Sequence, residues 1–266
     1  MFNNSLEIFH IKREQKIASR LLPIDHMHDD LFLVEYPKSG ITYLCHLFAC
    51  LEFNSSNMDI NFFNLHSFIP DIHEGKSIST HTARNLNRRI LKSHASYNKK
   101  YRYVVHLARD PLDTMVSYKN YWLSHWNKDI PFSKLIRSWR GIPRWKRHTN
   151  AWINSEVNQR YIPVSYQSLL DRPATVLKYI YDCYGVQISD SDIQRAILNS
   201  SLENMQSSEQ FWNYGHRHKF QGAKFVGSKK FKKDDICDED IKYIRHQTSD
   251  IYSLFISMCN KALDNN

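Results

Sequence analysis

The sequence predicts one α/β domain of three layers, in which helices flank a central and mainly parallel β-sheet. Two observations support this prediction. Four short apolar runs, each of the length of a buried strand, alternate with segments of helical periodicity. No stretch rich in Gly, Pro or Ser divides the 266 residues, so we expect one domain over residues 1–266, with residues 1–28 as an N-terminal extension.

The expected strands cover residues 31–36, 89–92, 103–108 and 161–165. After the first strand, an amphipathic helix is expected to pack through its apolar positions between Leu44 and Leu51. After the third strand, Asp110 is suited to cap a helix that begins at Pro111 and continues through Trp122. Strands and helices that alternate in this way form right-handed crossovers, which place a ligand at the carboxyl ends of the strands.

Two further helices are expected in the second half of the chain. Asp171 and Pro173 repeat the arrangement of cap and proline, and the apolar stripe that follows ends at Gly185. Asp238 is suited to cap the last long helix, in which apolar residues recur at spacings of three and four. Residues 54–85 show no such period, and we expect them to cover the site.

Composition limits the classes of function. Hydrophobic residues at 42% and aromatic residues at 13% exclude a disordered chain. A formal net charge of +9 indicates an anionic partner, which leaves nucleic acid, an acidic surface and a polyanionic small molecule open. Neither a signal peptide nor a transmembrane segment of roughly 18 apolar residues is recognised, so we expect a cytoplasmic protein. The 5 cysteines, an odd number, are expected to be reduced.

The most informative segment is Tyr36-Pro-Lys-Ser-Gly-Ile-Thr-Tyr43, which we call the lysine turn. A turn between a buried strand and a helix directs backbone N–H groups and the helix dipole at one point, which favours an anion there. Lys38 adds a cation, and Ser39 and Thr42 add hydroxyl groups. The order of Lys and Gly differs from that of a Walker A loop, which disfavours a P-loop nucleotide kinase. An ordinary turn with an exposed lysine is the alternative.

Polar residues also follow the next two expected strands. Lys92 and His94 lie two positions apart, so in an extended chain both side chains face the same side, as a cation and a base. Arg109 ends the third strand and Ser117 lies two turns along the following helix, where together they could grip one phosphate. The competing interpretations are an exposed Lys-x-His loop and a surface ion pair between Arg109 and Asp113.

Three motifs, taken in this order, resemble those of the soluble sulfotransferases that use 3′-phosphoadenylyl sulfate (PAPS). They are the lysine turn, the Leu-Lys-Ser-His segment that ends at His94, and Leu-Ala-Arg-Asp-Pro-Leu-Asp-Thr-Met-Val-Ser-Tyr at residues 107–118. The corresponding family motifs are Y-P-K-S-G-T-T-W, K-T-H and R-x-P-x-D-x-x-x-S-Y. Weaker similarities follow at residues 164–166 and 200–205. Three ordered motifs are more specific than any one of them.

The resemblance implies a P-loop-like version of the predicted fold and a donor site for PAPS as co-substrate. The 5′-phosphosulfate would be held by Lys38 and by the turn residues Ser39, Gly40, Ile41 and Thr42. The 3′-phosphate would be bound by Arg109 and Ser117. The adenosine would lie near Tyr43, Tyr166, Ser200 and Leu202.

The resemblance also implies a reaction. His94 would take the proton of a hydroxyl acceptor or, as the second choice, of an amine, while Lys38 and Lys92 stabilise the transferred group. Transfer of this kind depends on positioning and on cations, so no metal is expected. The acceptor would be a small molecule or a saccharide, and the composition of the covering loops does not identify it.

The chain departs from the family motifs in three places. Ile41 replaces a threonine and Tyr43 replaces a tryptophan, which removes one hydroxyl group and leaves less area for stacking on adenine. Residues 225–231 only loosely resemble the family's R-K-G-x-x-G-x-W loop. We expect Lys224 to contact the 3′-phosphate there. The alternatives are Arg217, Lys229 and Lys230.

Other signals have simpler interpretations. Two His-x-His pairs, at residues 26–28 and 216–218, lack partners at the spacing of a metal site. Four aromatic residues are expected to pack in the core rather than to line an acceptor pocket, namely Tyr118, Tyr121, Trp122 and Trp126. A nucleic-acid-binding protein without catalysis would explain the charge but would leave the Lys92 and His94 pairing as a coincidence, so no nucleic-acid partner is expected.

Overall fold

A four-stranded, all-parallel sheet forms the centre of the computed structural model, which describes residues 26–53, 60–61, 64–72, 81–125, 128–154, 160–207 and 231–264. The strands are β1 (Leu31–Glu35), β2 (Ile90–Ser93), β3 (Tyr103–Ala108) and β4 (Arg160–Ser165), in the order β2-β1-β3-β4. All four predicted strands are confirmed, with ends within one residue of those expected. Because the strands are parallel, their carboxyl ends lie at one edge of the sheet.

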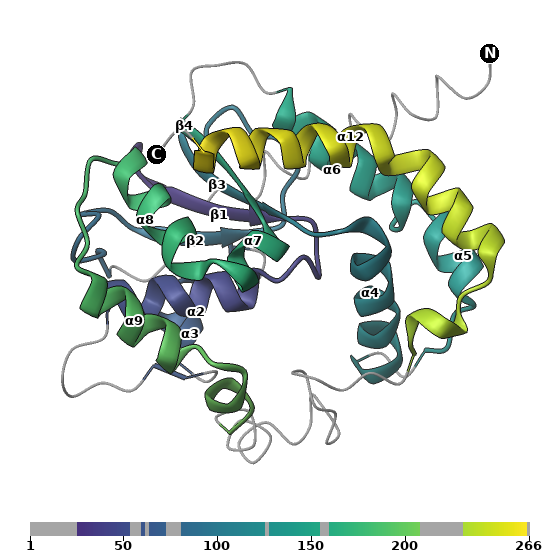
Figure 1. Cartoon of the computed structure of the whole chain (residues 1–266), viewed down its shortest axis with the longest axis horizontal. Coiled ribbons are helices and arrows are strands. Elements are labelled where there is room, and N and C mark those ends of the chain that lie inside the picture. Colours follow the sequence, from purple (N-terminus) through teal and green to yellow (C-terminus); the bar gives the residue numbers. More distant parts are fainter. Residues whose placement is uncertain are drawn as a thin grey trace.

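Helices cover both faces of the sheet, which gives the three predicted layers (Figure 1). They are α2 (Ile41–Glu52), α3 (Leu65–Phe68), α4 (Pro111–His125), α5 (Phe132–Arg137), α6 (Ile142–Ile153), α7 (Tyr166–Asp171), α8 (Pro173–Cys183), α9 (Asp190–Asn199) and α12 (Asp238–Asp264), with a 3-10 turn η2 (Lys233–Asp235). Leu31 and Leu33 of β1 pack with α2, α8 and α9 in one apolar cluster. Phe32 and Val34 point the opposite way and pack with Trp152 of α6, so both faces of β1 are buried.

The predicted start of α4 is confirmed in detail. Oδ1 of Asp110 accepts the N–H of Asp113 at 3.0 Å, and Pro111 is the first helical residue. A proline at this position costs no hydrogen bond, because the first N–H groups of a helix lack partners within it. The helix continues to His125, three residues beyond the predicted end.

The second predicted cap is wrong, although the helix after it is present. α8 begins at Pro173, but Arg172 precedes it without a side-chain cap, and Asp171 is the last residue of α7. The proline alone therefore marks this start. Gly185 follows the end of α8 with φ of 70°, as expected of a residue that ends a helix. The last helix begins at Asp238 itself.

Some predictions concern residues outside the described ranges. They include residues 1–25 of the expected N-terminal extension, much of 54–85, Trp126, residues 216–218 and the basic loop with Lys224. Within the described ranges, no helix combines the length and the apolar character needed to cross a bilayer. All five cysteines are free thiols.

Candidate functional site

The lysine turn combines a left-handed backbone with a close packing contact. Lys38 and Gly40 have φ of 78° and 110°. A Cβ atom on Gly40 would lie 2.3 Å from the ring of Tyr166, the first residue of α7, so only glycine fits both the backbone angle and the space. Within the turn, the hydroxyl of Ser39 donates to the carbonyl of Tyr36 at 2.8 Å. These contacts fix the direction in which α2 leaves the sheet.

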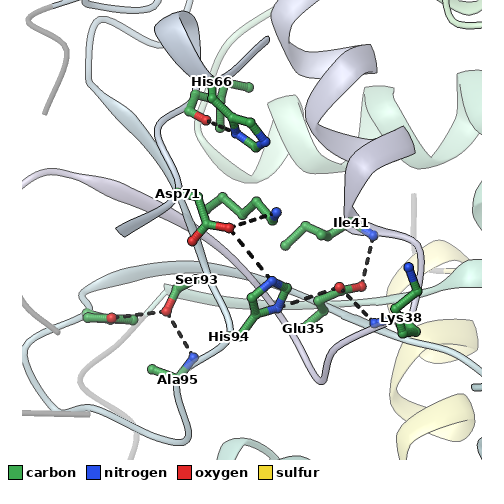
Figure 2. A network of polar contacts seen from close by, with 11 residues as sticks. Glu35, Lys38, Ile41, His66, Asp71, Ser93, His94 and Ala95 are labelled. Atoms are coloured by element: carbon green, nitrogen blue, oxygen red, sulfur yellow. Dashed lines mark hydrogen bonds and ion pairs between the residues drawn. The ribbon is translucent and has the colours of Figure 1, made fainter. Parts of the chain in front are cut away.

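A buried carboxylate lies beneath this turn (Figure 2). Glu35, the last residue of β1, accepts the N–H of Ile41 at 2.8 Å and the N–H of Lys38 at 3.2 Å. The N–H of Ser39 donates to the carbonyl of Tyr36 at 3.2 Å. The sequence predicted amides directed at an external anion, but those of Ser39 and Ile41 already have acceptors within the protein. Glu35 was not predicted as a site residue, because it ends an apolar run and its position is that of a strand residue.

Burial and neighbouring charges set the protonation of this region. Burial raises the pKa of Glu35 to about 7, although the N–H of Ile41 and the charges of Lys92 and Lys38 oppose the rise. Burial also lowers the pKa of Lys38 to about 8, against the attraction of Glu35, and the charges of Lys92 and Arg109 lower it further. A carboxyl group and an amine whose pKa values are both shifted toward neutral pH therefore interact electrostatically at this turn.

Lys92 and His94 face the same side, as predicted, and meet a second acid there. One carboxylate oxygen of Asp71 lies 2.8 Å from Nζ of Lys92 and 3.9 Å from Nε2 of His94. The other ring nitrogen, Nδ1, lies 3.6 Å from Oε1 of Glu35. His94 thus lies between two carboxylates and next to the lysine turn (Figure 2). Burial disfavours the charge of Lys92, but Asp71 outweighs it, and the pKa of Lys92 is raised.

Asp71 was not predicted. It lies in the stretch without periodicity, where nothing in the sequence distinguishes it from other acidic residues. In the structure, the N–H of Lys92 donates to the carbonyl of Pro70 at 2.9 Å, and Asp71 forms a parallel bridge with Lys92. Asp71 of this stretch therefore reaches Lys92 and His94, whereas much of residues 54–85, which we expected to cover the site, lies outside the described ranges.

Arg109 reaches the same edge from the end of β3. Its guanidinium carbon lies 4.7 Å from the ring centre of Tyr166, a cation–π contact that orients the side chain. Its Nε is buried and has no hydrogen-bond acceptor among the described residues, which suits a site for an anion. The alternative partner, Asp113, forms an ion pair with Lys233 at 2.5 Å. Ser117 is half-buried on α4, two turns beyond Arg109.

The remaining predicted site residues have mixed surroundings. Tyr43 is half-buried, and burial together with Tyr166 raises its pKa. Ser200 is buried, and its hydroxyl lies 2.8 Å from Nδ1 of His46 on α2, so this hydroxyl is engaged in the interior. Leu202 is 60% exposed. Lys224 lies outside the described residues.

The aromatic stripe of α4 divides between two environments. Tyr118 is buried against the ring of Tyr36, as core packing predicts. Tyr121 instead lies under Nζ of Lys38, which is 4.7 Å from the centre of its ring. A ring beneath the lysine holds the cation at the turn. The prediction of core packing is therefore confirmed for Tyr118. For Tyr121 it does not describe the contact with Lys38.

Three cations, one imidazole and two carboxylates thus meet at one edge of the sheet. Lys38, Lys92 and Arg109 supply positive charge for an anionic ligand with separated charged groups, and His94 supplies a base. Across the described part of the chain, no group of three or more His, Cys, Asp or Glu side chains is arranged to hold a metal ion.

The family described as Sulfotransferase domain matches residues 28–249 of this chain. Sulfotransferase 1E1 of Bos taurus is 24% identical over 204 residues, which cover 68% of this chain and 67% of that protein. Human sulfotransferase 2A1 is 20% identical over 199 residues, with 68% of each chain covered.

Solved structures show the same fold. A retinol dehydratase in complex with androsterone and the inactive cofactor PAP superposes with a TM-score of 0.64 and 17% identity, over 90% of this chain and 84% of that one. Mouse sulfotransferase SULT7A1 complexed with PAP gives a TM-score of 0.58 and 18% identity, over 85% of each chain. At these identities the likeness concerns the fold.

Proposed function

This chain belongs to the sulfotransferase family, and we propose that it transfers a sulfuryl group from PAPS to a hydroxyl group, an amine being the second choice of acceptor. The observation that carries this proposal is the meeting of Lys38, His94 and Arg109 at one edge of the sheet. A donor with a phosphosulfate at one end and a 3′-phosphate at the other needs two separated cationic sites. His94 lies next to the lysine turn, the proposed phosphosulfate side, and the acceptor would enter there.

The proposed reaction moves one group and one proton. The acceptor oxygen attacks sulfur, the bond between sulfur and the bridging oxygen of the 5′-phosphate breaks, and adenosine 3′,5′-bisphosphate leaves. The acceptor proton goes to His94. Lys38 and Lys92 offset the negative charge that develops on the bridging oxygen and the sulfuryl oxygens. Tyr121 and Asp71 keep the two lysines in place.

The donor residues are also a proposal, drawn from the family motifs and supported by the surroundings of each side chain. Arg109 fits the 3′-phosphate, because its buried Nε needs an acceptor and Tyr166 already holds the guanidinium. Ser117 and Lys224 would add to this site. Tyr43 and Tyr166 would border the adenosine, whereas Ser200 would have to contribute through an atom other than its hydroxyl.

The acceptor is proposed by class. One structural neighbour was solved with androsterone and another retinol dehydratase structure with retinol and PAP, both small hydroxyl compounds. A small molecule with a hydroxyl group is therefore the first class to test, with saccharides next.

Calorimetry tests the donor assignment. The full chain should bind adenosine 3′,5′-bisphosphate more tightly than ADP, which lacks the 3′-phosphate, and more tightly than a short oligonucleotide. Equal affinity for the bisphosphate and ADP would remove the proposed 3′-phosphate site. Preference for the oligonucleotide would favour a nucleic-acid-binding protein.

A further inference from the structure

We propose that Glu35 is a residue of the donor site that exchanges a proton: its carboxylate holds the lysine turn in the free protein, and it binds a proton when the donor binds. The inference rests on the proposed function, since it concerns the same site. It goes beyond that function because it gives a role to a residue outside the family motifs and makes donor binding dependent on pH.

The position of Glu35 carries the first step. Its side chain is 3% exposed, and its two oxygens accept the N–H groups of Lys38 and Ile41 at 3.2 and 2.8 Å. These backbone donors belong to the turn beside which the 5′-phosphosulfate is proposed to lie, and Glu35 already accepts them. The carboxylate therefore lies at the turn where the donor charge is proposed to bind, and bulk water screens it little.

The second step concerns like charges. A phosphosulfate placed at the lysine turn would lie next to an ionised Glu35, and two anions in a buried site repel each other strongly. The nearby cations offset part of this repulsion, but the same cations have to neutralise both the phosphosulfate and Glu35. Among the described residues, the charged and titratable groups around Glu35 are Lys38 in the turn, Lys92 and His94 at the end of β2, Asp71 beside them and Cys45 on α2.

A bound proton removes the conflict without loss of the turn. A neutral carboxyl group keeps an oxygen that can accept one N–H and gains an O–H that can donate to a phosphate or sulfate oxygen. Burial already places the pKa of Glu35 at about 7, so a further negative charge nearby would keep the proton bound through neutral pH. A role limited to capping the start of α2 would require no such proton.

The test counts protons during binding of adenosine 3′,5′-bisphosphate. Lys38, whose pKa is about 8, would also take up a proton, so the comparison uses a Lys38→Arg background in which the cation is permanent. Titration calorimetry at pH 7.5, in two buffers of different ionisation enthalpy, gives the number of protons taken up. We expect the K38R protein to take up more protons than the K38R/E35Q protein, by up to one proton per ligand.

The affinity should follow the same pattern. Between pH 7 and 9, the K38R protein should lose up to about tenfold in affinity for the bisphosphate for each pH unit. Binding requires the uptake of a proton, and the proton concentration falls tenfold with each unit. The K38R/E35Q protein should lose much less and should bind more tightly at pH 9. Lys92 and Cys45 do not interfere, since the pKa of Lys92 is raised and that of Cys45 is about 12.

Glu52→Gln in the same background is the matched control. Glu52 is a second buried carboxyl group, at the far end of α2, and it accepts the N–H of Asn85 rather than any N–H of the turn. The Glu52→Gln substitution should leave the number of protons taken up per ligand unchanged. Equal proton uptake in K38R and K38R/E35Q would overturn the inference. That result would mean that another group, such as His94, takes the proton. Failure of the unaltered chain to bind the bisphosphate would instead contradict the proposed function.

Discussion

A buried glutamate lies near each end of α2, and the two glutamates have different neighbours. Glu35 lies just before the helix, among two lysines, an imidazole and the N–H groups of the turn. Glu52 is the last helical residue, and its carboxylate accepts the hydroxyl of Tyr181 at 2.5 Å and the N–H of Asn85 at 2.7 Å. Burial raises the pKa of both groups. A raised pKa alone therefore does not identify a functional residue. The groups that surround the residue distinguish the two cases.

The difference separates chemistry from stability. Around Glu35, cations and a base gather at the carboxyl edge of the sheet, where a ligand can add charge. Around Glu52, the hydrogen-bond donors among the described residues are the hydroxyl of Tyr181 and the N–H of Asn85, so the carboxylate links α2 to α8 and to residue 85. Changes near Glu35 should thus alter catalysis and ligand binding as well as the free energy of unfolding, whereas changes near Glu52 should alter the free energy of unfolding alone.

The largest effect is expected at the Glu35 end. His94→Ala should reduce turnover by about 10²–10⁴-fold, the usual contribution of a general base, while the affinity for adenosine 3′,5′-bisphosphate stays within a few-fold. Steady-state rates and calorimetry on the same preparation measure both. His246→Ala, an exposed histidine on α12, is the control and should have no effect. Undiminished turnover of H94A would show that His94 is not the base.

A pH dependence of stability should appear at both ends of α2. For a carboxyl group whose pKa is raised on folding, the stabilising contribution is complete below the unfolded pKa and is lost as the pH rises through the folded pKa. For Glu35 this window runs from 4.5 to about 7, and the loss is at most about 3 kcal/mol. Urea denaturation across this range should show a smaller fall in the free energy of unfolding for E35Q and for E52Q than for the natural chain. A fall of the same size in E35Q would contradict the raised pKa.

Arg109→Ala should weaken binding of adenosine 3′,5′-bisphosphate by roughly 10- to 100-fold, because a charge-assisted hydrogen bond to phosphate is lost. Binding of AMP, which has no 3′-phosphate, should change little. Arg195→Ala is the control, since Arg195 lies on the surface of α9 and pairs with Asp192. A loss of equal size for both nucleotides would place Arg109 elsewhere than at the 3′-phosphate.

The sequence predicted the parts of the molecule that depend on local patterns. The four strands follow from apolar runs, and the start of α4 follows from Asp110 and Pro111, because both signals act over a few residues. The pairing of Lys92 and His94 on one side follows from the two-residue period of an extended chain.

Residues that act through tertiary contacts escaped prediction. Glu35 reads as the end of a strand, and its importance appears only when the turn folds back over it. Asp71 lies in a stretch without periodicity, and the pairing with Lys92 that brings it to the site spans 21 positions, from 71 to 92. The family motif predicted that Ser200 lies near the adenosine, but its hydroxyl is hydrogen-bonded to a buried histidine on α2. Motifs indicate which residues meet a ligand, and they do not show which protein groups compete for the same atoms.

The Glu52 end yields an effect expected on stability alone, and it offers a matched pair of variants. Tyr181→Phe removes a hydroxyl that donates to Glu52, so the free energy of unfolding at pH 8 should fall by about 1–3 kcal/mol, the cost of a buried charged group that loses a hydrogen bond. Tyr184→Phe removes a buried hydroxyl that has no hydrogen-bond partner among the described residues, and it should leave the stability unchanged or slightly higher. Both variants should keep the turnover of the folded protein, because neither residue contacts the lysine turn. Loss of turnover in Y181F without loss of stability would mean that the two ends of α2 are coupled, and the separation of chemistry from stability would fail.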